Sequence, residues 1–317
     1  IKPDPTIQQI ETGVTLIKEK QCTAILAVGG GSSIDAAKAI ATRVKNGYPI
    51  AWMAGLMRVA FRPMPLYAVP TTAGTGSETT IAAVVSDPAN KRKFAIMDPK
   101  LVPVAAALDG ALMTGLPPAI TAATGMDALT HAVEAYISRN ALKRTDVEAL
   151  EATKLIMENL PKVMKDGQDV VARQAMAEAS FKAGVAFTSA GVGYVHAIAH
   201  NMGAYYHVPH GLANAIIMPQ VLDYSLPECA PRLATLGEVS GLKQAGDTTE
   251  QLAQRFVAHI RQLNAEFGIP STIAKLQASD IPAITTAALK EAHWTYAVPR
   301  YMDRTACEAL IGRLLPA

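Results

Sequence analysis

Short apolar runs of strand length alternate with helical patterns over the first third of the sequence. Four such runs occur, at residues 24–28, 66–69, 81–85 and 94–97. The last two flank a turn at Asp87 and Pro88, a pattern typical of a hairpin. Apolar residues at helical spacing predict helices over residues 6–20 and 32–41. Because strands that alternate with helices pair in one direction, we expect a mostly parallel sheet covered by helices.

The pattern changes after a Leu-Pro-Pro segment at residues 116–118. From there the sequence is a series of long amphipathic helical patterns, such as residues 249–267, with almost no strand signal. We therefore expect an α/β nucleotide-binding domain over residues 1–115 and an all-helical domain over residues 116–317. No flexible linker separates them, so the domains should pack firmly and leave a cleft between them.

Composition excludes several classes of protein. The net charge is +2 and aromatic residues make up 5% of the chain, which argues against partners such as nucleic acid or an anionic membrane. Three scattered cysteines form no disulfide framework or thiolate metal motif, and we expect a cytoplasmic protein. No apolar run approaches the roughly 18–20 residues of a membrane span.

A polar turn rich in Gly or Thr follows each of the first two strands. The first turn, residues 29–32, holds three glycines and a serine, and a helical pattern follows it. Because first-turn amides of a helix lack partners and the helix dipole favours negative charge, this turn predicts a phosphate site. The second turn supplies the hydroxyl groups of Thr71, Thr72 and Thr75. Together they predict a nucleotide across the strand ends, with a plain strand–helix turn as the alternative.

Four of the seven histidines and one aspartate fall into two short segments: Asp127, His131, His196, His200 and His210. Asp127 and His131 are four residues apart, as are His196 and His200, so each pair shares one helix face. His210 stands between a proline and a glycine that predict a turn out of the second helix. This clustering predicts a divalent metal site rather than several independent structural histidines.

The expected ligands are imidazoles and one carboxylate, without a thiolate. Such a set suits Fe(II), Zn, Co, Ni or Mn and disfavours a structural zinc site of the cysteine type. Spacing alone leaves open which of His196, His200 and His210 is not a ligand.

Five segments carry a family resemblance. They are GGGSSID from Gly29 to Asp35, PTTAGTGSE from Pro70 to Glu78, KFAIMDP from Lys93 to Pro99, TGMDALTHAVE from Thr124 to Glu134, and GYVHAIAH from Gly193 to His200 followed by PHG at 209–211. Through these segments, which cover most of the chain in family order, the sequence resembles the iron-containing (group III) alcohol dehydrogenases.

The resemblance implies a role for each candidate residue. It assigns Asp127, His131, His196 and His210 as metal ligands, and it leaves His200 unligated near the substrate as the candidate catalytic residue. The glycine turn is assigned to the pyrophosphate and Lys93 to a cofactor ribose. The full set of candidate cofactor-binding residues is Gly29, Gly30, Gly31, Ser32, Asp35, Thr71, Thr72, Thr75, Thr80 and Lys93.

The resemblance also implies a Rossmann-like cofactor domain, a helical metal-binding domain and a homodimer. The expected reaction is reversible hydride transfer between a short primary alcohol or diol and NAD, or NADP, with Fe(II) as the expected metal. Family members carry a further N-terminal stretch before the point that matches Ile1, which contributes the first strands of the cofactor domain. Either the sequence is a piece of a longer chain, or its cofactor domain is incomplete.

Three alternatives stay open. A non-redox metal-dependent enzyme resembling dehydroquinate synthase would share the broader architecture, but the two polar turns favour a dinucleotide. A zinc-dependent glycerol dehydrogenase matches the run from His196 to His210 less well. A truncated, non-catalytic metal-binding form is the third.

Overall fold

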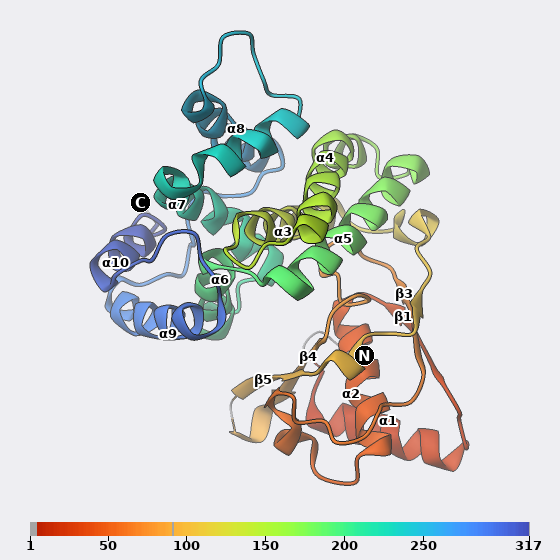
Figure 1. Ribbon diagram of the computed structural model, residues 1–317. Helices are drawn as coiled ribbons and strands as arrows, with labels where there is room; N and C mark the ends of the chain where they lie inside the picture. Colours follow the sequence, from red (N-terminus) through yellow and green to blue (C-terminus); the bar gives the residue numbers. More distant parts are fainter. Residues whose placement is uncertain (1–4, 91, 317) are drawn as a thin grey trace.

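The computed structural model describes residues 5–90 and 92–316. An α/β part lies below a helical part in Figure 1, with colours running from red to yellow in the first and from green to blue in the second. The two parts follow one another along the chain without intermixing.

The described residues of the α/β part form two three-stranded sheets. In the first, β1 (Ile25–Gly29), β3 (Leu66–Pro70) and β6 (Ala105–Ala106) are all parallel, in the order β1-β3-β6. In the second, the order is β2 (Gly55–Leu56), β5 (Arg92–Met97), β4 (Ala82–Asp87), and only the β4–β5 pair is antiparallel. The four predicted strands and the hairpin are therefore confirmed. The sequence missed β2 and β6 because two residues show no periodicity.

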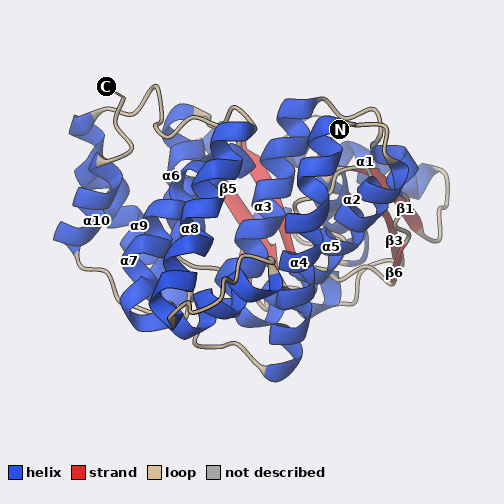
Figure 2. Ribbon diagram, turned by 90° about the horizontal axis from the view of Figure 1, so that it is seen from above, coloured by secondary structure: helices blue, strands red, loops and turns tan. Residues whose placement is uncertain are grey.

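Two helices cover these sheets. Helix α1 (Ile7–Glu19) begins with a capping box, in which Thr6 and Gln9 each bond the other's backbone amide. Helix α2 (Gly31–Lys45) follows β1 directly and packs against strands of both sheets, so that it joins them (Figure 2). Both helices lie where the apolar spacing predicts them.

The helical part consists of eight α-helices among the described residues. They are α3 (Pro118–Ile137), α4 (Lys143–Lys165), α5 (Val170–Ala190), α6 (Tyr194–Tyr206), α7 (His210–Val239), α8 (Thr249–Glu266), α9 (Ile281–Thr295) and α10 (Arg304–Gly312). Helix α3 is central and contacts α4, α5 and α7. Every residue from Gly125 to Ile137 is buried, so the small side chains between its large apolar residues also face neighbouring helices.

One local prediction was wrong. The segment around His210 is the start of helix α7 and not only a turn out of the preceding helix: Pro209 is its N-cap residue and His210 its first residue. Helix α6 ends earlier, at Tyr206, and its C-cap residue His207 has a left-handed backbone with φ of 56°. Proline suits the beginning of a helix because its missing N–H has no intrahelical partner there.

The two parts pack closely through the loop after β3. A Cβ atom on Gly184 of α5 would lie 2.1 Å from Thr79 Oγ1, and one on Gly74 would lie 2.7 Å from the Thr124 carbonyl oxygen of α3. Only glycine permits such an approach. The loop that follows β3 is thereby held against the two helices that lead to the histidine cluster.

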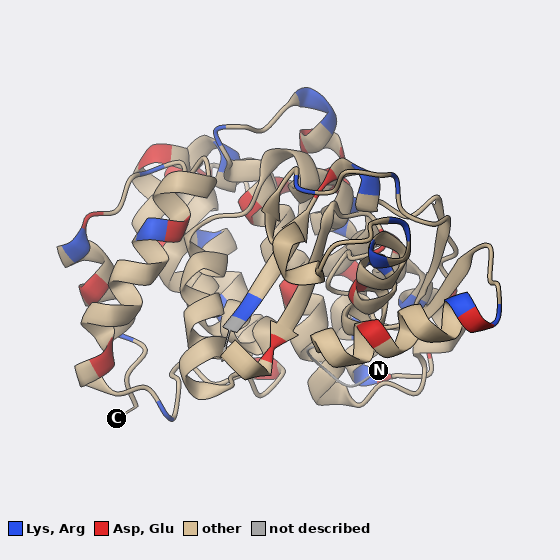
Figure 3. Ribbon diagram, turned by 90° about the horizontal axis from the view of Figure 1, so that it is seen from below, with Lys and Arg blue, Asp and Glu red and all other residues tan. Residues whose placement is uncertain are grey.

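Charged residues of both signs are interspersed along the ribbon in Figure 3. No helix within the described part of the chain is long and apolar enough to span a membrane.

Candidate active site

Four predicted side chains from three helices come together. Asp127 and His131 lie on α3, His196 lies on α6, and His210 opens α7. One potential ligand atom from each lies within 4.8 Å of those of the other three. Asp127, His131 and His196 are buried, whereas the side chain of His210 is 42% exposed. The helical spacing of four places the first two on one face, and the packing of α3, α6 and α7 brings the others to it.

An asparagine that the sequence analysis missed occupies the centre of this group. The Asn214 side-chain amide donates to Asp127 Oδ1 at 2.6 Å and faces His210 Nε2 at 3.1 Å and His196 Nε2 at 3.2 Å. One amide group has two hydrogens and cannot serve three acceptors. The buried Oδ1 of Asn214 has no hydrogen-bond partner among the described residues. Asp127, His196 and His210 therefore offer more lone pairs than the Asn214 amide has hydrogens. Such a site fits a divalent cation, which would bind the carboxylate and the imidazoles together.

The protonation of the histidines favours metal binding. Burial and the neighbouring imidazoles hold the pKa of His196 well below its usual value. Burial also lowers the pKa of His131. The His210 side chain is partly exposed, but desolvation of its ring by the surrounding protein lowers its pKa to about 4; in both residues the attraction of Asp127 acts in the opposite direction. At neutral pH these rings are therefore neutral and carry the lone pairs that a metal needs.

Hydrogen bonds outside the cluster fix the tautomers of two histidines. His196 Nδ1 donates to Glu134 at 2.6 Å, and His131 Nδ1 donates to the Gly74 carbonyl at 3.3 Å. In each ring the lone pair is then on Nε2. A partner on the second nitrogen is the usual arrangement for a metal-binding histidine, because it orients the ring and raises its basicity.

The Glu134 carboxylate is held by three donors. Besides His196, it accepts from the backbone amides of Gly193 at 2.9 Å and Val195 at 2.8 Å. Burial raises its pKa to about 7, although these hydrogen bonds act in the opposite direction. Gly193 must lack a side chain, because a Cβ there would lie 2.7 Å from Glu134 Oε1. Glu134 ends the sequence motif that begins at Thr124, but no sequence pattern indicated a role for it.

His200 stands beside the cluster and is not part of it. Its ring stacks on His210, with centroids 5.3 Å apart and an angle of 15° between the planes. Its Nδ1 donates to Glu291 Oε1 at 2.7 Å, and its side chain is 44% exposed. Burial alone would raise the pKa of Glu291, but the bonds from His200 and Tyr296 outweigh it and lower the pKa.

The two polar turns meet at one edge of the first sheet. Strands β1 and β3 pair in parallel with Gly29 opposite Pro70, and Thr71 N donates to the Gly29 carbonyl at 3.0 Å. A Cβ on Gly31 would lie 2.8 Å from the side chain of Thr75. Helix α2 begins at Gly31, so its first-turn amides lie at the same edge, as the sequence predicts for a phosphate site.

Matches to family models and matches to individual relatives point to the same family. Residues 1–110 match the family model described as iron-containing alcohol dehydrogenase, and residues 121–315 match its C-terminal counterpart. The chain belongs to the iron-containing alcohol dehydrogenase family. Its oxidoreductase activity on alcohols follows from this membership together with the relatives described next.

Among relatives of this chain, the NAD-dependent methanol dehydrogenase of Bacillus methanolicus is 43% identical over 87% of this chain and 72% of its own. The 1,3-propanediol dehydrogenase of Klebsiella pneumoniae is 39% identical over 92% of this chain and 76% of its own. The crystal structure of a 1,3-propanediol oxidoreductase superposes with a TM-score of 0.95 at 37% identity, over 99% of this chain and 82% of that one. The predicted family and fold class are thus confirmed.

Two predicted cofactor residues are engaged inside the family's α/β domain. The Asp35 carboxylate accepts from the Ser77 hydroxyl and from Val84 N, and burial raises its pKa despite the nearby Lys38. Thr80 Oγ1 accepts from Lys38 Nζ at 2.8 Å. These contacts give both side chains a structural role, and their contact with a cofactor stays a prediction. Lys93 is exposed on β5, and its charge contributes to the lowered pKa of His210.

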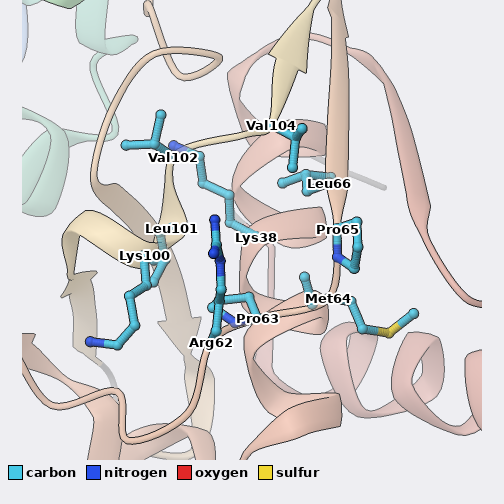
Figure 4. A pocket seen from close by; sticks show the side chains of 11 residues that line it. Lys38, Arg62, Pro63, Met64, Pro65, Leu66, Lys100, Leu101, Val102 and Val104 are labelled. Atoms are coloured by element: carbon cyan, nitrogen blue, oxygen red, sulfur yellow. The ribbon is translucent and has the colours of Figure 1, made fainter.

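A pocket of about 320 Å³ lies elsewhere in the α/β part (Figure 4). Its basic lining residues are Lys38, Arg62 and Lys100, and it contains none of the predicted site residues. Lys38 Nζ is already bonded to Thr80 and to the Ala82 carbonyl, and Lys100 is paired with Asp98. We therefore assign neither substrate nor cofactor to this pocket.

Proposed function

We propose that the protein is an NAD-linked, iron-dependent dehydrogenase of short primary alcohols or diols. The observation that carries this proposal is the clustering of Asp127, His131, His196 and His210, three of which (Asp127, His196 and His210) face the single amide group of Asn214. The names of the relatives support NAD as the cofactor and a short alcohol or diol as the substrate. The family description supports iron as the metal.

The four clustered side chains would hold the cation, and the turns at residues 29–32 and 71–75 would hold the nucleotide phosphates. A divalent cation supplies Lewis acidity toward the alcohol oxygen, and the nicotinamide supplies a hydride acceptor. His200 takes up the alcohol proton on Nε2, because its Nδ1 hydrogen is already bonded to Glu291. Stacking on His210 keeps this imidazole beside the cluster whose cation would bind the alcohol oxygen.

The test is a nicotinamide absorbance assay on protein reconstituted anaerobically with Fe(II), against methanol and 1,3-propanediol. Chelator-sensitive NADH formation is the expected result, with a lower rate when NADP replaces NAD. Reconstitution with Zn(II), Co(II), Ni(II) or Mn(II) compares the possible metals. Absence of any nicotinamide signal in protein shown to hold its metal would contradict the proposal and favour a non-redox reaction of the dehydroquinate synthase type.

We also propose that the enzyme is a homodimer, on the basis of the family resemblance. Light scattering coupled to size-exclusion chromatography measures its mass in solution, and a value near the 33.5 kDa of one chain would contradict the dimer.

A further inference from the structure

We propose that Glu291 is the positioning residue that fixes the tautomer and orientation of His200. This inference rests on the proposed function, in which His200 takes up the alcohol proton. His200 Nδ1 lies 2.7 Å from Glu291 Oε1, across 91 residues of sequence. The contact links α6 to α9, two helices that pack against each other.

A second donor immobilises the carboxylate. The hydroxyl group of Tyr296 donates to the same oxygen, Glu291 Oε1, at 2.6 Å. Tyr296 is the C-cap residue of α9, one turn beyond Glu291, so the helix end itself sets the geometry of the pair. The Glu291 carboxylate is therefore held in one rotamer, with Oε1 facing His200.

His200 needs such a partner more than the buried His196 does. Its side chain is 44% exposed, whereas that of His196 is 3% exposed. A half-exposed imidazole without a fixed partner samples several rotamers and both neutral tautomers. With Nδ1–H bonded to Glu291, the lone pair stays on Nε2, which is the form that can accept a proton from the substrate.

Substitution of the carboxylate should reduce turnover without removing the metal. In Glu291→Gln, the amide can donate to Nδ1 and thereby favour the tautomer with its hydrogen on Nε2. We expect kcat to fall about 10- to 100-fold, as is usual when a group that orients a functional histidine is replaced. Metal content and the KM for NAD should stay unchanged, because Glu291 is neither one of the clustered candidate ligands nor one of the candidate cofactor-binding residues. Glu291→Asp should recover part of the loss, and Tyr296→Phe should cause a smaller one.

A double-mutant cycle separates positioning from general damage. In a His200→Ala background, Glu291→Gln should have no further effect on kcat, because the group that it positions is already gone. Glu308→Gln is the matched control: its side chain is 35% exposed against 30% for Glu291, and it pairs with Arg304 on α10. An equal loss in both backgrounds, or in the control, would overturn the inference.

Nitrogen-15 NMR of the imidazoles tests the same inference without turnover. The His200 resonances, identified by their loss in His200→Ala, should show a protonated Nδ1 and an unprotonated Nε2 in the wild type, and a mixture of tautomers in Glu291→Gln. Identical tautomers in both proteins would refute the role of Glu291 whether or not the enzyme is active. A wild type inactive toward alcohols, with the tautomer shift present, would instead contradict the proposed function alone.

Discussion

Replacement of Glu134 by glutamine should lower the affinity for the metal, although Glu134 is not one of the candidate ligands. The carboxylate accepts three N–H groups, from Gly193 and His196 at Oε2 and from Val195 at Oε1. Glutamine keeps the shape but replaces one of these oxygens with an NH₂ group, which must face an N–H donor. If the NH₂ faces His196, the ring has to accept at Nδ1 and carry its hydrogen on Nε2, the atom that points into the ligand cluster.

The size of the effect follows from these contacts. Each buried donor that loses its acceptor lowers the unfolding free energy by about 1–3 kcal/mol, and the substitution leaves one or two donors without an acceptor. The metal-free protein should therefore lose roughly 1–6 kcal/mol of unfolding free energy. Substitutions of groups that orient a metal ligand typically cost about 10- to 100-fold in affinity, which corresponds to about 1.4–2.7 kcal/mol.

Competition with a chromophoric chelator measures the metal affinity of the wild type and Glu134→Gln, with Zn(II) or Co(II) as the probe. Denaturant titration of the metal-free forms measures stability, and Glu308→Gln serves as the surface control. A metal Kd within about threefold of the wild type, in a variant that is folded, would refute the orienting role of Glu134, since even the lower bound is tenfold.

Four further predictions concern other parts of the molecule. Asp127→Ala should lose the metal, because it removes the one carboxylate of the cluster; unchanged metal stoichiometry by elemental analysis would contradict this. His200→Ala should keep the metal and lose about 10²- to 10⁴-fold in kcat; loss of the metal would show that His200 is a ligand. Gly184→Val should lower the unfolding free energy by at least about 1–3 kcal/mol in denaturant titrations, because a side chain at this position has no space. Gly312→Ala should not lower it, because no atom lies within 4 Å of a Cβ added there. Burial lowers the pKa of Lys38 from 10.5 to about 8. Between pH values of about 8 and 10.5, the unfolded chain therefore binds more protons than the folded protein does. The unfolding free energy of the wild type should rise with pH over this range by about 3 kcal/mol relative to that of Lys38→Met. Parallel pH profiles of the two proteins would contradict this expectation.

Local signals explain why most elements could be predicted from the sequence. Helices α1 and α8 begin at capping boxes, in which Thr6 bonds Gln9 and Thr248 bonds Gln251, so their starts depend only on neighbouring residues. The pairing of Asp127 with His131 likewise needs only helical spacing. The start of α7 was missed because a proline before a histidine and a glycine resembles a turn, whereas proline also suits a helix N-terminus.

Long-range contacts explain what could not be predicted. Spacing did not decide among His196, His200 and His210, because the decision depends on where α6 and α7 lie against α3. Asn214 is four residues beyond His210 on the same helix face, and this spacing was the one available signal for it. Glu291 carried no signal at all: its partner is 91 residues away, and no periodicity connects them.

The hydrogen bond from His131 to the Gly74 carbonyl connects the proposed nucleotide turn to the proposed metal cluster, so binding at the two sites should be coupled. Gly74 lies in the loop whose threonines face the glycine turn, so a nucleotide that shifts this loop also shifts the acceptor that orients His131. By reciprocity, whatever free energy the metal gains from a bound nucleotide, the nucleotide gains from the metal. Redesign of this loop for a different dinucleotide would therefore also change the metal affinity, and the two properties have to be selected together.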